Sequence, residues 1–175
     1  MSQFGCLIAD LNRWKAITAK DRFYVAGETG LWAACLLRLA RALWLVRTPL
    51  IGPVARLLAL LAARVVEVLF GVAIPPSVEI GPGFYIGHIG AITFFAGTRV
   101  GRNLSIGPGV VVGPRGPDRN GVPELGDDVY VGSGAKLLGE IRIGHRARIG
   151  ANAVVLCDVP DDATAVGIPA RIRIR

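Results

Sequence analysis

Residues 125–155 read LGDDVYVGSGAKLLGEIRIGHRARIGANAVV. An aliphatic residue returns at every sixth position of this stretch: Leu125, Val131, Leu137, Ile143, Ile149 and Val155. The same spacing occurs earlier in the chain, in two shorter blocks: Ile74, Ile80, Ile86 and Ile92, then Val100, Ile106 and Val112. A period of six matches neither the helical repeat of about 3.6 residues nor the two-residue alternation of a strand.

Glycine directly follows nine of these thirteen aliphatic positions. Because glycine accepts backbone angles that other residues resist, the pattern predicts short straight strands joined by tight corners. Hexapeptide repeats of this kind build parallel β-helices, in which each coil buries its aliphatic residues against the next coil. With three repeats to a coil, thirteen repeats predict a triangular prism of a little over four coils.

The glycines and the charges divide the 175-residue chain into two parts. Residues 1–73 hold 5 of the 23 glycines, and residues 74–175 hold the other 18. The first part carries 9 basic and 4 acidic side chains, and the second part carries 11 basic and 9 acidic side chains. We therefore predict a helical N-terminal segment at residues 1–72 and a β-helix at residues 73–175. Residues 113–124 interrupt the repeat and should project from the β-helix as a loop. The hydrophobic content of 52% excludes a disordered chain.

Two stretches of the N-terminal part, residues 31–47 and 53–70, are rich in leucine and alanine and predict helices. Arg38 and Arg41 interrupt the first stretch and Arg56 and Arg64 the second, so neither should cross a membrane. Two interpretations remain open. The helices form a hairpin packed on the protein or on a second copy, or they lie peripherally on the surface of an anionic bilayer.

Other features of the sequence bear on the cellular location and the partners of the protein. Cys6, Cys35 and Cys157 are odd in number and far apart, which predicts neither a disulfide framework nor a zinc site. No charged leader with an apolar run and a cleavage site is visible, so we expect a cytoplasmic protein, with the inner face of the membrane as the place of any peripheral contact. The net charge of +7 comes without a basic run or a nucleic-acid motif, and we expect no nucleic-acid partner.

Three stretches of the chain resemble a known family: residues 80–91 (IGPGFYIGHIGA), 121–139 (GVPELGDDVYVGSGAKLLG) and 149–171 (IGANAVVLCDVPDDATAVGIPAR). They are similar to the hexapeptide-repeat acyltransferases of the serine acetyltransferase superfamily. Within it, residues 74–81 most resemble the polysaccharide-cluster O-acetyltransferases of the colanic-acid type. The resemblance implies a mainly β fold, a left-handed parallel β-helix after a short α-helical segment. It also implies a homotrimer with binding grooves between adjacent subunits.

The resemblance implies roles for particular residues. His88 aligns with the catalytic base of the serine acetyltransferases, and acetyl-CoA is the implied acyl donor. We expect five residues to bind this donor: Gly113, Ser133, Arg148, Ala151 and Arg171. Counting repeats places His88 on one corner of the prism, stacked with Pro108, Ser133 and Ala151. Three coils at a spacing of about 4.8 Å then separate His88 from Ala151 by roughly 14 Å, the reach of a pantetheine arm.

The expected reaction is a direct transfer in which His88 takes the proton of an acceptor hydroxyl while that hydroxyl attacks the thioester. The family pairs its base with an aspartate, but Ala73 and Gly87 occupy the aligned positions here. Residues 120–123 also lack a basic side chain to hold a carboxylate. We therefore predict a carbohydrate acceptor, in an exopolysaccharide or glycan precursor. Arg115 and Arg119 are the candidates to contact this acceptor or, alternatively, the coenzyme A phosphates. A serine O-acetyltransferase and a catalytically inactive assembly subunit are the alternatives.

The second histidine, His145, should lie on a different corner from His88 and remain a surface residue. With two histidines, one subunit cannot assemble the three-histidine site of the γ-type carbonic anhydrases, which share this fold. We therefore expect no catalytic metal.

Overall fold

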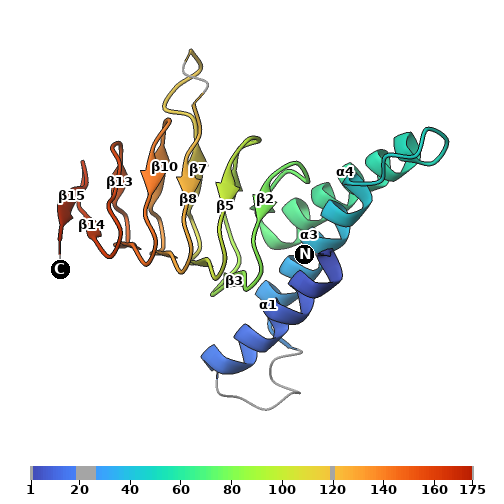
Figure 1. Ribbon diagram of the computed structural model, residues 1–175, viewed down its shortest axis with the longest axis horizontal. Coiled ribbons are helices and arrows are strands. Elements are labelled where there is room, and N and C mark those ends of the chain that lie inside the picture. Colours follow the sequence, from blue (N-terminus) through green and yellow to red (C-terminus); the bar gives the residue numbers. More distant parts are fainter. Residues whose placement is uncertain (1, 19–26, 119–120, 175) are drawn as a thin grey trace.

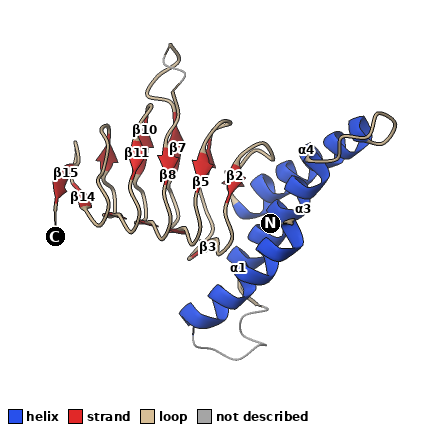
Figure 2. Ribbon diagram, viewed as in Figure 1, coloured by secondary structure: helices blue, strands red, loops and turns tan. Residues whose placement is uncertain are grey.

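The structure is a computed structural model that describes residues 2–18, 27–118 and 121–174. Three helices come first: α1 (Gln3–Thr18), α3 (Thr29–Trp44) and α4 (Gly52–Phe70). A prism of short strands follows, with the helices at one end and the C-terminus at the other (Figure 1). Figure 2 shows how completely the two kinds of structure are separated along the molecule.

The strands form three sheets, one for each face of the prism. The first face contains β1 (Val72–Ala73), β4 (Ile92–Phe94), β7 (Val111–Gly113), β10 (Lys136–Leu138) and β13 (Val154–Val155). The second face contains β2 (Glu79–Ile80), β5 (Arg99–Val100), β8 (Glu124–Leu125) and β11 (Arg142–Ile143). The third face contains β3 (Tyr85–Ile86), β6 (Ser105–Ile106), β9 (Tyr130–Val131), β12 (Arg148–Ile149), β14 (Thr164–Val166) and β15 (Arg171–Arg173).

The interior of the prism is built from the aliphatic residues of the repeat. Strands of successive coils pair in parallel, and on the third face Ile86, Ile106, Val131 and Ile149 stack in register. Of the thirteen predicted positions, twelve are buried and Ile80 is half-buried. The predicted parallel β-helix is therefore confirmed. Its last strand, β15, pairs with β14 in the antiparallel sense and ends the sheet.

The corner between β3 and β4 is longer than the six-residue repeat predicts. Val112 pairs with Phe94, whereas Ile92 pairs with Val72 of the preceding coil. The chain therefore takes eight residues from Ile86 to Phe94, instead of the usual six. The sequence pattern concealed this insertion because Ile92 and Phe94 alternate with an outward threonine in β4, so both are buried.

The helices cap the first coil of the prism. Both predicted helices are present as α3 and α4, with α3 starting two residues earlier and ending three residues earlier than expected. The structure adds α1, within the segment predicted to be helical, at residues for which the sequence analysis named no particular helix. Trp14 of α1 is buried and its ring lies 4.4 Å from that of Tyr85 on β3. Helix α3 approaches so closely that a Cβ at position 30 would collide with the carbonyl oxygen of Ile86, which explains Gly30.

A buried ion pair joins the helices to the prism. The carboxylate of Asp10 on α1 accepts hydrogen bonds from the amides of Gly83 (2.7 Å) and Phe84 (2.8 Å) and from Nε of Arg38 on α3 (2.8 Å). The Arg38 guanidinium also donates to the carbonyl oxygens of Ile80 and Gly81, each at 2.6 Å. Three separate segments therefore meet at one carboxylate.

Candidate active site

The predicted base, His88, lies in the long corner between β3 and β4. Across this corner the amide of Gly109 donates to the carbonyl oxygen of Gly90 at 2.8 Å. One coil further on, the amide of Gly134 donates to Pro108 in the same way, also at 2.8 Å. Gly90 is therefore the counterpart of Pro108, and residues 88–89 are the two inserted residues.

This register corrects the predicted stack. Pro108, Ser133 and Ala151 do follow one another along one ridge of the prism, as the pairing of the third-face strands requires. His88 does not continue that row. It belongs to an insertion at the first-coil end of the ridge, because Gly90 of the same corner occupies the stacking position. The imidazole is exposed, and none of the residues that the structure describes makes a hydrogen bond to it.

The polar side chains around the ridge differ from those of the family. Ala73, at one of the family's aspartate positions, pairs with Thr93 on the first face, so no carboxylate is available from that position. The structure places one further polar side chain at the ridge, that of Lys136, which the sequence analysis did not single out. Its ammonium group donates to the carbonyl oxygen of Gly109, at the ridge, at 2.5 Å. The outward position of Lys136 in a strand next to the ridge was the signal that could have identified it.

The predicted donor-binding residues fall into two groups. Ser133 and Ala151 are exposed on the ridge, and Arg148 is exposed on the adjoining third face, with its guanidinium 5.1 Å from the centre of the Tyr130 ring. Arg171 is exposed on β15 at the end of the same face. Gly113 is separate from these residues. It is buried at the end of β7, where a Cβ would collide with the ring of Phe95.

The described residues of the segment between β7 and β8 project from the prism (Figure 1). Arg115 is exposed near the base of this loop and contributes to a cavity of about 360 Å³ with Glu140 and Leu156. Arg119 lies outside the described residues. A larger cavity, of about 720 Å³, lies along the second face beside Arg99 and Arg142. Neither cavity includes His88, whose ridge joins the third face to the first.

His145 lies on a different corner, between the second and third faces, as predicted. Its Nδ1 accepts a hydrogen bond from the amide of Asp127 at 3.0 Å, and half of its side chain is exposed. The backbone amide and then the guanidinium of Arg102 hold the pKa of Asp127 below its ordinary value. Within the described residues, no three histidine, cysteine, aspartate or glutamate side chains are arranged to hold a metal ion.

The family description "Bacterial transferase hexapeptide (six repeats)" matches residues 123–157. Among curated proteins, the serine acetyltransferase of Mycobacterium tuberculosis (strain H37Rv) is 42% identical over 119 residues, 67% of this chain and 52% of that protein. The serine acetyltransferase of Helicobacter pylori (strain J99) is 41% identical over 143 residues, 81% of this chain and 80% of that protein. The chain spans about half the length of several other curated relatives that it matches.

Solved structures agree with these relatives. The serine acetyltransferase of Neisseria gonorrhoeae superposes with a TM-score of 0.87 at 32% identity, covering 99% of this chain and 67% of that one. The Brucella abortus enzyme in complex with coenzyme A superposes with a TM-score of 0.85 at 29% identity, covering 96% of this chain and 66% of that one. The expected fold, a left-handed parallel β-helix after short helices, is confirmed.

These comparisons overturn one part of the sequence analysis. The resemblance to the colanic-acid type of polysaccharide O-acetyltransferase, and with it the carbohydrate acceptor, is wrong, because the similar proteins and structures are serine acetyltransferases. A single aligned position such as Ala73 says less about the acceptor than the similarity of the whole β-helix does. From its fold, its repeat and its identity to the Helicobacter protein over most of both chains, this chain belongs to the serine acetyltransferase family.

Proposed function

We propose that the protein is an acetyl-CoA-dependent serine O-acetyltransferase in which His88 is the general base. The observation that carries this proposal is the 41% identity to a serine acetyltransferase across 81% of the chain. The structure adds an exposed imidazole on an inserted corner at one end of a ridge of small residues. This is where a base can reach a substrate without any rearrangement of the prism.

The proposed step is a single displacement. The neutral imidazole of His88 accepts the proton of the serine hydroxyl while the hydroxyl oxygen attacks the carbonyl carbon of the acetyl group. The carbon–sulfur bond then breaks, and the coenzyme A sulfur leaves and recovers a proton from the imidazolium. The products are O-acetylserine and coenzyme A. A backbone amide at the glycine-rich corner would stabilise the oxyanion formed during the attack.

The donor would lie along the ridge. Ser133 and Ala151 carry small exposed side chains, which leave room for a pantetheine arm running away from His88. From the first coil to the fourth this path measures roughly 14 Å. Arg148 and Arg171 are the cations placed to meet its phosphates, and guanidinium groups bind phosphate well because they can donate two parallel hydrogen bonds. The structural neighbour solved with coenzyme A supports this choice of donor.

The acceptor site would be completed by a second copy. A serine carboxylate requires a cation, and burying it without one would be costly. Arg115, exposed near the base of the loop between β7 and β8, is one candidate cation for this carboxylate in a neighbouring subunit, and Arg119, outside the described residues, is the other. We therefore propose a homotrimer in which the loop of one subunit meets the His88 ridge of the next.

The test uses the purified full chain with acetyl-CoA, and measures O-acetylserine by mass spectrometry across an acceptor panel of L-serine, L-threonine and hexoses. We expect L-serine to be preferred. The variant His88→Ala should lose about 10²–10⁴-fold in rate, as removal of a general base does, while retaining acetyl-CoA binding in calorimetry. His145→Ala, the matched control on another corner, should keep its activity. Undiminished turnover by His88→Ala would refute the role, and turnover of hexoses but not serine would refute the acceptor.

A further inference from the structure

The outward face of α4 is apolar and uncovered. Seven aliphatic residues fall within an arc of about 120° when residues are placed about 100° apart around the helix: Val54, Leu57, Leu58, Leu61, Val65, Val68 and Leu69. All of them are exposed, Leu57 by 58% and Val68 by 74% of its surface. The opposite side of the helix, with Ala55, Ala59 and Val66, is buried. The outward residues, which we name the α4 apolar face, therefore contribute nothing to the core of this chain.

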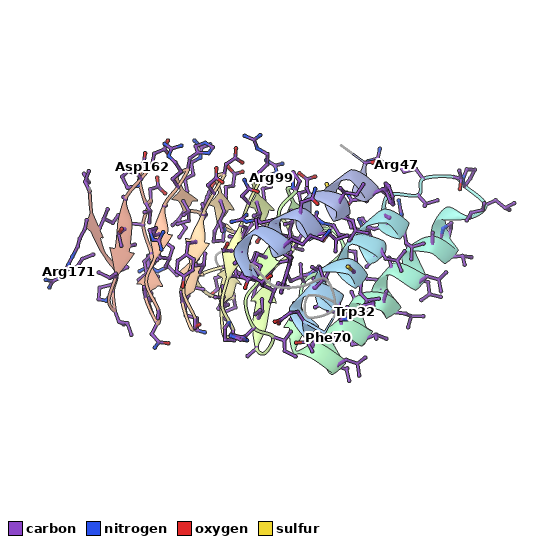
Figure 3. All side chains as sticks on the ribbon, turned by 90° about the horizontal axis from the view of Figure 1, so that it is seen from below. Trp32, Arg47, Phe70, Arg99, Asp162 and Arg171 are labelled. Atoms are coloured by element: carbon purple, nitrogen blue, oxygen red, sulfur yellow. The ribbon has the colours of Figure 1, made fainter. Side chains whose placement is uncertain are left out.

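The apolar surface continues to the end of the helical hairpin. Leu50 and Ile51, in the turn between α3 and α4, are 88% and 61% exposed. This turn lies at the opposite end of the molecule from the C-terminus (Figure 1), and Arg47 lies beside it (Figure 3). A flat partner could contact the turn and the α4 apolar face together. Contiguous apolar surface of this kind marks an interaction site.

The charges around this surface are positive. Arg47 and Arg56 are exposed, and Arg56 lies over the ring of Trp44 at 5.8 Å. The only acid of α4, Glu67, is already paired with Arg64 at 2.6 Å. On the helices that the structure describes, the other acidic side chain is Asp10, which is buried. A second copy packed face to face would offer Arg47 no unpaired acidic side chain on the described helices.

An anionic lipid surface complements both properties. No helix within the described residues is long and apolar enough to cross a bilayer. A helix with one apolar face and with arginines on its polar side and in the preceding turn can instead lie in the plane of the interface, with its aliphatic side chains among the acyl chains and its cations at the headgroups. Each arginine near an anionic surface strengthens such binding.

We propose that the α4 apolar face, together with the turn at Leu50 and Ile51, binds the surface of an anionic bilayer. The β-helix then remains outside the bilayer. This inference does not depend on the identity of the acceptor, because it rests on the helices alone.

The experiment measures co-sedimentation of the full chain with vesicles of phosphatidylcholine alone or mixed with phosphatidylglycerol. We expect binding to the mixed vesicles that weakens as salt is added, and little binding to phosphatidylcholine alone. The variant Arg47→Gln/Arg56→Gln should bind about fivefold more weakly for each arginine lost. The variant Val54→Ser/Leu57→Ser/Val68→Ser should bind at least tenfold more weakly, because it removes the side chains that would enter the acyl region.

A matched control removes exposed apolar residues from the other end of the molecule. Ile168 and Ile174 are 73% and 81% exposed, and Ile168→Ser/Ile174→Ser should bind vesicles as the unmodified chain does. Circular dichroism checks that every variant is folded. Absence of binding to mixed vesicles, or equal losses in the control, would overturn the proposal. So would sedimentation velocity showing that the α4 substitutions dissociate an assembly of this chain while vesicle binding is unchanged.

Discussion

Replacing Asp10 by alanine should destabilise the protein severely, because three segments depend on its carboxylate. The side chain of Asp10 is wholly buried and that of Arg38 is 7% exposed. The change Asp10→Ala removes four hydrogen bonds: two from Arg38, at 2.8 and 3.1 Å, and those from the amides of Gly83 and Phe84. The guanidinium is left in place with its charge uncompensated.

The magnitude follows from the burial of the partner that remains. Breaking a buried ion pair by removing one member costs about 3–5 kcal/mol. The two amides that lose their acceptor add to this cost, but the terms overlap within a single network and are not additive. We therefore expect a loss of about 4 kcal/mol in the free energy of unfolding, a large part of the total stability of a chain of this size.

The assay is urea unfolding followed by circular dichroism at one fixed protein concentration. Asp127→Ala is the matched control: it also removes an aspartate paired with an arginine, at 3.0 Å from Arg102, but the arginine is 69% exposed. Such a pair contributes at most about 1 kcal/mol, and the amide of Arg102, which also loses its hydrogen bond to Asp127, is exposed, so water can replace that acceptor. Replacing both buried partners, as in Asp10→Leu/Arg38→Met, should recover part of the loss because no charge is left unpaired. If Asp10→Ala unfolds within about 1 kcal/mol of the unmodified chain, the buried carboxylate does not hold the helices to the prism, contrary to our reasoning.

Three further predictions concern the long corner, the thiols and one carboxylate. Deleting residues 88–89 should restore a six-residue corner, so the chain should keep its circular dichroism spectrum and its unfolding midpoint while losing acetyl transfer; a molten product would contradict the register. Burial raises the pKa of the Cys35 thiol, so maleimide at neutral pH should label exposed Cys157 well before Cys35, as peptide mass mapping would show. The lowered pKa of Asp127 contributes stability that is present above its ordinary pKa and lost as pH falls through the folded value. The difference in stability between Asp127→Asn and the unmodified chain should therefore shrink in acid, and a difference that grows there would contradict this sign.

The regular coils could be predicted from the sequence alone. An inward aliphatic residue every six positions, followed by glycine, is a local pattern, and each coil repeats it whatever the rest of the chain does. Leucine- and alanine-rich composition identified α3 and α4 in the same way. The two-residue insertion at His88 could not be predicted, because Ile92 lies at the expected six-residue spacing although Phe94 is the residue that stacks on the next coil. A local pattern cannot show which of two buried residues meets the next coil.

The acceptor was mispredicted for a related reason. Ala73 and Gly87 replace two acidic residues of the family, and their absence suggested a different substrate. A site assembled from a ridge, a projecting loop and a neighbouring copy can place its charges elsewhere in the sequence. Aligned positions therefore say less about the acceptor than the similarity of the whole chain does.

The sequence by itself determined that the chain folds as a prism of parallel coils preceded by amphipathic helices, because both follow from spacing and composition within a few residues. The tertiary structure alone decided how these parts are joined. The pairing of Asp10 with Arg38, the approach of Gly30 to Ile86 and the position of His88 at the end of the ridge each bring together residues distant along the chain. Such contacts are set by three-dimensional packing and burial, which no periodicity in the sequence records.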